Sequence, residues 1–304
     1  MKSRYLNYNQ KLKAEFADRV QKITINAGFT CPNRDGNKGI GGCTYCNNQT
    51  FSPEYCKPSK SVSQQIEEGI AFFQHKYSSQ LYLAYFQSYT NTYDTFENLK
   101  AIYEQALSFP NVVGIVVGTR PDCVNNELLD YFADLARNYY IMIEYGIEST
   151  NDETLELINR GHNFECAKNA IFETANRGIN TSGHIILGLP NESRATILSH
   201  AKKLSELPLT SLKMHQLQLV HGTKMAVQFT EYPDWFKLYS ADEYIDLAID
   251  FLELLRPEIA IERFVSQSPP KLLIAPEWGL KNYEFTAKLE KRLVERDTWQ
   301  GKKY

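Results

Sequence analysis

The chain has 304 residues, of which 43% are hydrophobic and 23% are charged, and its formal net charge at pH 7 is −3. These values are ordinary for a soluble globular protein, and six cysteines are too few for a disulfide scaffold. The mild negative charge gives no overall attraction to nucleic acid. Because no apolar run approaches the length of a membrane span, we expect no membrane association and a cytoplasmic location.

Short apolar runs alternate with amphipathic stretches in the first 220 residues, which predicts an α/β fold with a parallel sheet. The predicted strands cover residues 22–26, 81–86, 112–117, 140–147, 181–187 and 211–219. Helices are predicted at residues 63–77, 95–107, 125–138, 152–159, 165–178 and 192–204. The alternation weakens in residues 221–304, where we expect helices at 241–255 and 283–296 and a short strand at 258–264. We therefore expect a main domain, residues 1–220, with a C-terminal extension packed on it.

The loop after the first predicted strand carries three cysteines, Cys31, Cys43 and Cys46, in a glycine-rich C-x11-C-x2-C spacing. Three thiols at this spacing can close on one soft metal centre. An ordinary iron–sulfur electron carrier uses four thiolates per cubane, so a set of three leaves one iron free to bind something else. Zinc is the alternative, with Cys56 as fourth ligand, although structural zinc sites tend to pair two C-x2-C knuckles and this chain has one.

The cysteine triad and the surrounding run of residues 23–36 resemble the radical S-adenosylmethionine (SAM) superfamily, in particular a bacterial group related to the Elongator catalytic subunit. The usual spacing in that superfamily is C-x3-C-x2-C, so the loop here is longer. The resemblance implies that Cys31, Cys43 and Cys46 hold a [4Fe-4S] cluster whose fourth iron binds the amino and carboxylate groups of SAM. It also implies a SAM-side role for Tyr45 and a partial (β/α)6 TIM-type barrel.

In a parallel α/β barrel the active site lies at the carboxyl ends of the strands. The second predicted strand ends in a polar segment containing Gln87, Ser88, Thr90 and Asn91. Related enzymes often bind the methionine amino group there with a Gly-Gly-Glu type segment, which this chain lacks. The resemblance places these four residues near the SAM amino group, and a turn of polar capping residues is the alternative.

The third predicted strand is followed by a T-R-P-D run that resembles the Elongator branch, which implies a SAM contact for Thr119. Arg120 in the same run can fork onto a carboxylate, and its plain alternative is an ion pair with Asp122 or Glu144. Glu144 and Glu148 lie four residues apart on the fourth strand, so they share one side of an extended chain. Glu148 is nearer the strand end, and the resemblance implies that it contacts SAM.

Two further positions complete the predicted cofactor site. Arg160 belongs to an N-R-G-H run like that of the Elongator branch, where the arginine approaches the SAM carboxylate. For His162 in the same run we favour a helix C-terminal cap over a chemical role. His184 points into the barrel if Ile185 and Leu187 face the helices, so it is a candidate for ribose or substrate contact, with a satisfied core histidine as the alternative.

The resemblance implies reductive cleavage of SAM to methionine and a 5′-deoxyadenosyl radical that abstracts hydrogen from a substrate. It extends to the tail, residues 266–304, and favours a tRNA base, the wobble uridine, as substrate. An electron donor such as flavodoxin or ferredoxin is expected. The alternatives are a radical SAM enzyme acting on a small molecule, as in coproporphyrinogen chemistry, and a zinc-stabilised RNA-binding protein without catalysis.

Overall fold

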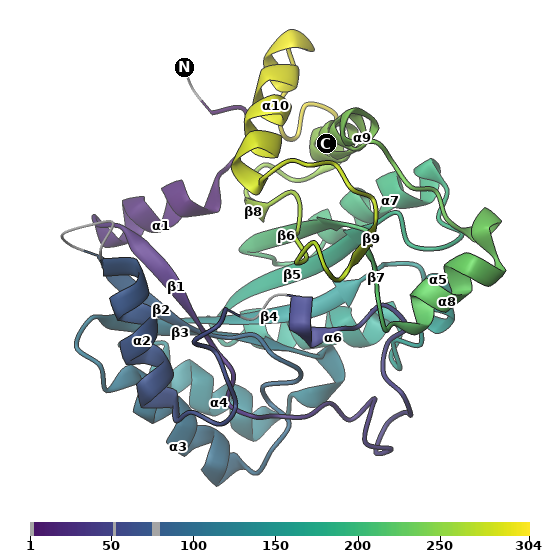
Figure 1. The fold of residues 1–304 in the computed structure, drawn as a ribbon. Helices are drawn as coiled ribbons and strands as arrows, with labels where there is room; N and C mark the ends of the chain where they lie inside the picture. Colours follow the sequence, from purple (N-terminus) through teal and green to yellow (C-terminus); the bar gives the residue numbers. More distant parts are fainter. Residues whose placement is uncertain (1–2, 51–52, 75–79) are drawn as a thin grey trace.

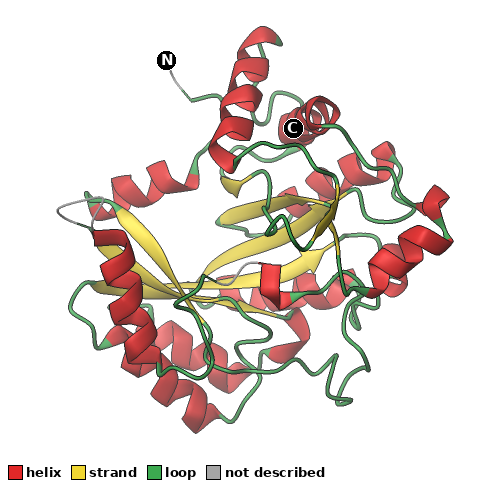
Figure 2. Cartoon of the chain, viewed as in Figure 1, coloured by secondary structure: helices red, strands yellow, loops and turns green. Residues whose placement is uncertain are grey.

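The computed structural model describes residues 3–50, 53–74 and 80–304 of the chain. Its main sheet consists of β1 (Val20–Ile25), β2 (Leu81–Phe86), β3 (Val112–Thr119), β4 (Tyr140–Glu148), β5 (Asn180–Leu187), β6 (Ser211–Gln216) and β8 (Ala260–Arg263). These seven strands run parallel in the order β1-β2-β3-β4-β5-β6-β8 and form a curled sheet with helices on its outer face (Figures 1 and 2). The predicted α/β class and partial barrel are confirmed, with one strand more than the six expected.

The helices are α1 (Tyr8–Phe16), α2 (Val62–Gln74), α3 (Phe96–Leu107), α4 (Asn126–Leu135), α5 (Asp152–Leu157), α6 (Phe164–Ala175), α7 (Arg194–Ser205), α8 (Lys224–Glu231), α9 (Ala241–Leu254) and α10 (Asn282–Glu295). Several begin at polar caps, where the side chains of Thr95, Asn125, Asn163 and Ser193 each accept a hydrogen bond from the first helical turn. The last residues of the predicted helix 63–77 lie outside the described ranges. No helix among the described residues combines the length and the apolar character needed to cross a membrane.

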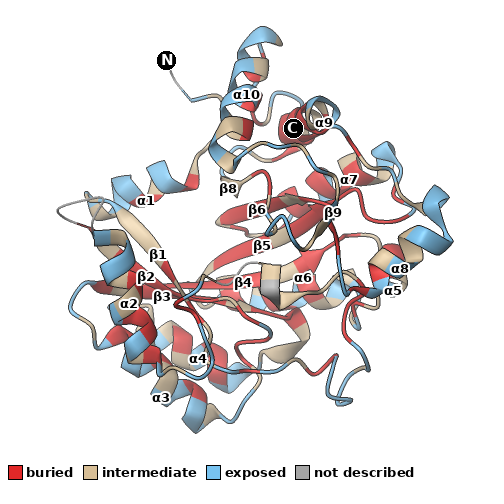
Figure 3. Ribbon diagram, in the orientation of Figure 1, coloured by how far each residue is buried: buried red, intermediate tan, exposed pale blue. Residues whose placement is uncertain are grey.

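The main sheet is buried on both faces, as Figure 3 shows for its central strands. Side chains alternate between the faces, so Ile143 and Tyr145 of β4 pack under the outer helices while Met142 and Glu144 face the inside of the curl. Burial on both faces explains why the strands appear in the sequence as nearly continuous apolar runs.

Helix α1, which the sequence did not predict, closes the inside of the curl at the amino ends of the strands. Tyr8 and Leu12 on its inner face pack in one apolar cluster with Leu83 and Met142 of the sheet. The hydroxyl groups of Tyr8 and Tyr140 lie 3.1 Å apart within this cluster. Helix α1 fills the curl at the amino ends of the strands, and the curl is open at their carboxyl ends.

The C-terminal part of the chain takes part in the main sheet, because β8 pairs in parallel with β6. The predicted strand 211–219 is not continuous: β6 ends at Gln216, and a short strand β7 (Leu219–Val220) pairs instead with β9 (Leu273–Ala275) in an antiparallel ribbon. Figure 1 shows this ribbon beside the carboxyl ends of the main strands. The domain division at residue 220 stays a prediction.

Candidate active site

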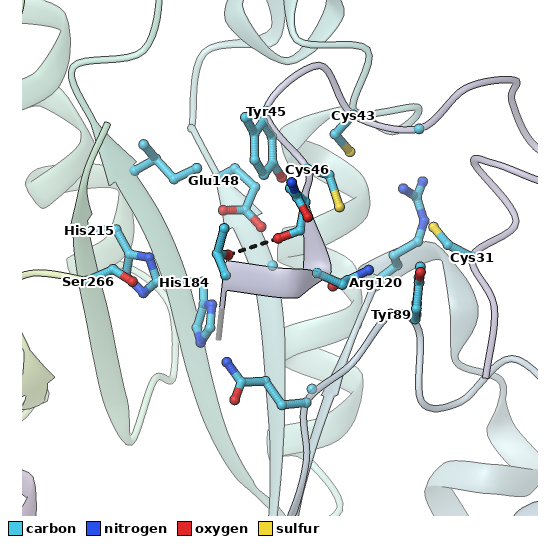
Figure 4. Close-up of a pocket in the computed structure, with 18 of the residues that line it drawn as sticks. Cys31, Cys43, Tyr45, Cys46, Tyr89, Arg120, Glu148, His184, His215 and Ser266 are labelled. Atoms are coloured by element: carbon cyan, nitrogen blue, oxygen red, sulfur yellow. Dashed lines mark hydrogen bonds between the residues drawn. The ribbon is translucent and has the colours of Figure 1, made fainter. Parts of the chain in front are cut away.

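A pocket opens at the carboxyl ends of the main strands, and we refer to it as the strand-end pocket. Its lining includes the three cysteines of the glycine-rich loop that follows β1 (Figure 4). Seven of the other predicted residues also line it: Tyr45, Gln87, Thr90, Thr119, Glu148, Arg160 and His184. The sequence therefore brings residues from distant parts of the chain to one place.

Polar donors surround the thiol of Cys43. Its Sγ lies 3.6 Å from Nδ2 of Asn33 and 3.6 Å from Nη1 of Arg160. The guanidinium of Arg34 donates to the backbone carbonyl of Cys46, with an N–O distance of 3.0 Å. Burial raises the pKa of the Cys46 thiol, the neighbouring Cys43 raises it further, and Arg34 opposes both. Positive charge and N–H donors around buried sulfur are the environment that a thiolate ligand requires.

Close packing and backbone conformation explain two of the glycines in the cysteine loop. A Cβ atom on Gly39 would lie 2.0 Å from Oδ1 of Asn33. Asn33 is fully buried, and its Nδ2 donates to the carbonyl oxygen of Asn159 at 2.7 Å. Gly42 has φ +76°, a conformation that side chains rarely adopt. The glycines thus fold the long segment between Cys31 and Cys43 against the run that contains Arg160.

Cys56, the fourth ligand in the zinc alternative, lies outside the strand-end pocket. It is 4% exposed and packs in the main apolar core, and burial raises the pKa of its thiol to about 11. Within the described ranges, no group of three or more His, Cys, Asp or Glu side chains is placed to hold a single metal ion. The arrangement does not provide four ligands for a zinc ion that includes Cys56.

Replacing Cys56 by alanine should therefore leave the iron and acid-labile sulfide content of anaerobically reconstituted protein unchanged. The expected cost is a lower free energy of unfolding, by about 1–3 kcal/mol, because a small apolar side chain is removed from a packed core. Iron analysis and the visible absorption spectrum measure the first effect. Loss of most of the metal in the Cys56→Ala variant would show that this thiol is a ligand after all.

The end of β4 departs from regular strand geometry at Glu148. The β4–β5 register shifts between Gly146 and Glu148, and Glu148 has φ +67°. This bulge leaves Oε1 of Glu148 3.8 Å from Nη2 of Arg160, which also donates to the carbonyl oxygen of Gly146 at 2.5 Å. A Cβ atom on Gly146 would lie within 2.6 Å of both side chains, so glycine is needed there.

Two arginines present buried N–H groups near the cysteines. Arg160 is 5% exposed, and none of the described residues accepts a hydrogen bond from its Nε. Arg120 is 3% exposed and forks onto Asp122 at 2.9 and 3.0 Å, which is the ion pair that the sequence left as the alternative for this residue. Its Nη1 has no acceptor in the part of the chain that the structure describes. Both arginines line the strand-end pocket, so an anionic group there would find these donors.

Ser88 and Asn91 do not line the strand-end pocket. Asn91 is fully buried, its Nδ2 donates to the carbonyl oxygen of Gly118 at 2.7 Å, and its own carbonyl oxygen accepts from the hydroxyl of Tyr103. Asn91 thus makes the kind of contact expected of a polar turn residue, and the role of the segment in binding SAM stays a prediction. The intervening Tyr89 has φ +63°, so side chains in this segment do not alternate as they would in a strand.

His162 is not free to act in the strand-end pocket, because it is absent from the lining. Its Nδ1 lies 3.1 Å from the carbonyl oxygen of Asn163, just before helix α6. Burial and, to a smaller extent, the charge of Arg160 lower the pKa of His162 to about 3. The residue is therefore neutral in the structure, and the predicted helix-capping role is replaced by a place in the turn before α6.

A cluster of buried charges lies beneath the strand-end pocket, and sequence reasoning missed it. We call it the buried charge cluster; its members are Lys22, Tyr85, Glu144, Lys213 and Glu262. Lys213 is 1% exposed, and its Nζ lies 2.5 Å from Glu144 and 3.1 Å from Glu262. Burial lowers the pKa of Lys213 to about 8, against the attraction of both carboxylates. The available signal was a lysine in the middle of β6, between Leu212 and Met214.

The curled parallel sheet, with a glycine-rich loop of three cysteines after its first strand, is the architecture of a radical SAM enzyme. Residues 26–204 match the model of the radical SAM superfamily, and residues 209–295 match that of the radical SAM C-terminal domain. The chain therefore belongs to the radical SAM superfamily, whose members use a [4Fe-4S] cluster and SAM.

The chain is 34% identical to the protein YtqA of Bacillus subtilis over 299 residues, which are 98% of this chain and 92% of that protein. It is 26% identical over 181 residues to Elongator complex protein 3 of Saccharomyces cerevisiae, covering 57% of this chain and 31% of that protein. A tRNA uridine(34) acetyltransferase of Dehalococcoides mccartyi is 25% identical over 189 residues, which are 61% of this chain and 39% of that protein.

Among solved structures, the archaeal Elp3 of Methanocaldococcus infernus has the same fold. The superposition has a TM-score of 0.70 at 15% sequence identity and covers 92% of this chain and 64% of that chain. The fold shared with this archaeal protein thus extends over nearly the whole of this chain.

Proposed function

We propose that Cys31, Cys43 and Cys46 are the ligands of the [4Fe-4S] cluster and that SAM occupies the rest of the strand-end pocket. The observation that carries the proposal is the convergence of these three thiols, from a loop that also contains Tyr45, with the strand-end residues of β2 to β5. When bound, the cluster supplies the electron that cleaves SAM to methionine and a 5′-deoxyadenosyl radical.

The donors of the strand-end pocket fit the polar groups of SAM. The unsatisfied Nε of Arg160 offers a cation and an N–H donor for the methionine carboxylate. Glu148, 3.8 Å from the same arginine, is an acceptor for an amino group or a ribose hydroxyl. Gln87, Thr90 and Thr119 add polar side chains along the neighbouring strand ends. The chain thus orients SAM, and α1, which fills the curl at the amino ends of the strands, keeps water from entering the pocket from that end.

We infer that the substrate is the wobble uridine of a tRNA. Support comes from the two relatives of the Elongator type, one of which is a tRNA uridine(34) acetyltransferase by name. The strand-end pocket is also lined by Gln218 and Ser266, whose polar atoms add to its polar lining. An electron donor such as flavodoxin or ferredoxin completes the proposal, since radical SAM enzymes generally need a reductant.

Two arginines at the end of α10 form ion pairs within the protein. Arg292 donates to both carboxylate oxygens of Asp246 at 2.8 and 2.9 Å, and Arg296 lies 2.5 Å from Asp250. These ion pairs join α10 to α9 and use the arginines for packing between the two helices.

Bulk tRNA from a strain lacking this gene should accelerate 5′-deoxyadenosine formation by the reconstituted protein, and the acceleration should fall as salt rises. The control is the same tRNA after digestion to nucleotides. Mass spectrometry of the recovered tRNA should show a mass change confined to the anticodon position 34. The absence of stimulation or of a modified nucleoside at low salt would overturn the tRNA proposal.

A further inference from the structure

A carboxylate–imidazole pair lies in the strand-end pocket on the side opposite the cysteine loop. Figure 4 shows His184 beside His215, away from Cys31. Oε1 of Glu144 lies 2.5 Å from Nε2 of His184. The carboxylate is 2% exposed, whereas the imidazole lines the pocket and its side chain is 19% exposed. Glu144 is thus buried in the protein, whereas His184 can contact a molecule bound in the strand-end pocket.

The surroundings of Glu144 keep it ionised. Burial would raise the pKa of this carboxyl, but the charges of Lys213 and Lys22, together with the contact to His184, outweigh burial and hold the pKa well below its usual value. The hydroxyl of Tyr85 also donates to Oε1 at 2.5 Å. Nε2 of His184 makes no hydrogen bond of regular geometry with a described residue, but an ionised carboxylate oxygen 2.5 Å away favours the tautomer with the proton on Nε2. Nδ1 then keeps its lone pair, and none of the described residues hydrogen-bonds to it.

A second carboxylate–imidazole pair in the same chain shows what a purely structural pair looks like. Oε1 of Glu192 lies 3.1 Å from Nε2 of His200, and both side chains are completely buried. Nδ1 of His200 is occupied by the hydroxyl of Thr150 at 2.7 Å. Both ring nitrogens of His200 have hydrogen-bond partners inside the protein. The ring of His184 instead contacts Glu144 at 2.5 Å and lines the strand-end pocket.

We propose that His184 is a general base that accepts a proton from the substrate, with Glu144 as its positioning residue. In this step a substrate N–H or O–H bond breaks, its electron pair stays on the nitrogen or oxygen, and the proton bonds to Nδ1. The resulting imidazolium is stabilised by the Glu144 carboxylate, and no electron changes hands. If the substrate is a uracil base, which rests on the proposed function, the group that loses the proton is the ring imide. The pairing of Glu144 with His184 does not depend on which substrate binds.

The charged and titratable groups around the pair come from every strand that faces it. They are Lys22 on β1, Tyr85 on β2, Lys213 and His215 on β6, and Glu262 and Arg263 on β8. His215 is excluded as the base, because Arg263 donates to its Nε2 at 2.6 Å and burial holds its pKa well below the usual value. Glu144 is therefore the anion in direct contact with His184.

A substrate-free experiment tests the pair. Diethyl pyrocarbonate acylates neutral imidazole, and peptide mass spectrometry gives the rate at each histidine as a function of pH in the reconstituted protein. Since an adjacent anion stabilises imidazolium, Glu144→Gln should raise the rate of acylation at His184 at a given pH by about threefold or more, which changes its rate profile. The exposed His221 should keep its profile, and the buried His200 should stay unmodified as long as the variant is folded. An unchanged His184 profile in folded Glu144→Gln protein would overturn the pairing.

A second experiment tests proton transfer and does not depend on Glu144→Gln being folded. His184→Ala should lower tRNA-dependent product formation by about 100-fold or more, and added imidazole should restore part of the product. His221→Ala is the matched control and should behave as wild type. Full activity of His184→Ala, or a loss of activity that imidazole does not restore, would contradict the assignment of His184 as a general base.

The two experiments separate the pair from the substrate assignment. If wild-type protein modifies no tRNA but the His184 profile still shifts, the tRNA proposal fails and the pair is supported. If tRNA is modified normally by His184→Ala, the tRNA proposal is supported and the general base is overturned.

Discussion

Cys43→Ala protein, reconstituted anaerobically, should release no 5′-deoxyadenosine above background when given dithionite and SAM, whereas wild-type protein should release it steadily. Cys43 is 9% exposed in the strand-end pocket, and its sulfur faces the N–H groups of Asn33 and Arg160 at 3.6 Å. Removing one of three thiolates leaves a second iron without a protein ligand, so the cluster should be lost or inactive. Chromatography of the reaction mixture measures the product.

The matched control for this experiment is Cys166→Ala. Cys166 lies in α6, outside the lining of the strand-end pocket, and it resembles Cys43 in side-chain volume and chemistry. This variant should keep both the iron content and the rate of 5′-deoxyadenosine release. Equal loss in the two variants would mean that the effect comes from general damage to the protein, and full activity of Cys43→Ala would contradict the ligand assignment.

Lys213→Met should lower the free energy of unfolding by about 3–5 kcal/mol, because it leaves the carboxylates of Glu144 and Glu262 in a buried site without their main partner. Lys213 is 1% exposed, and besides the two carboxylates its Nζ contacts the hydroxyl of Tyr85 at 2.9 Å. Lys22 lies 3.7 Å from Glu144 and compensates only in part. The shift in the midpoint of urea denaturation, followed by circular dichroism, measures the effect.

Lys168→Met tests whether burial is the reason for the large loss of stability expected in Lys213→Met. Lys168 also pairs with a glutamate, Glu165 at 3.4 Å, but both side chains are about half exposed. Exposed pairs of this kind contribute about 0–1 kcal/mol, so this variant should unfold almost as wild type does. A similar cost for the two lysines would contradict the view that the buried charge cluster stabilises the fold.

The parts of the fold that the sequence predicts well are those set by local pattern. β2 has the predicted bounds, 81–86, because its apolar run has turn residues on both sides. Helix α3 begins one residue after the predicted start because Thr95 is its cap. The cysteine loop was recognisable because spacing and glycine content are properties of consecutive residues. These features need no knowledge of distant parts of the chain.

The features that the sequence did not predict depend on contacts between distant residues. Helix α1 is polar apart from a narrow apolar face, so only its packing inside the curl explains why Tyr8 and Leu12 are buried. The positive φ of Tyr89 and Glu148 reverses the side-chain alternation that places residues on one face or the other. Such contacts also explain why Ser88 and Asn91, which were placed by position alone, lie outside the lining, and why the partners of Glu144 on β1 and β6 were not foreseen.

Electron–nuclear double resonance on the dithionite-reduced protein, with SAM labelled by nitrogen-15 in its amino group and oxygen-17 in its carboxylate, tests the central assignment most directly. The account predicts a [4Fe-4S] signal that changes when SAM is added and that shows hyperfine coupling to both labels, because three protein thiolates leave one iron for SAM. A signal that SAM leaves unchanged, or a colourless protein that contains zinc in place of iron, would contradict the account.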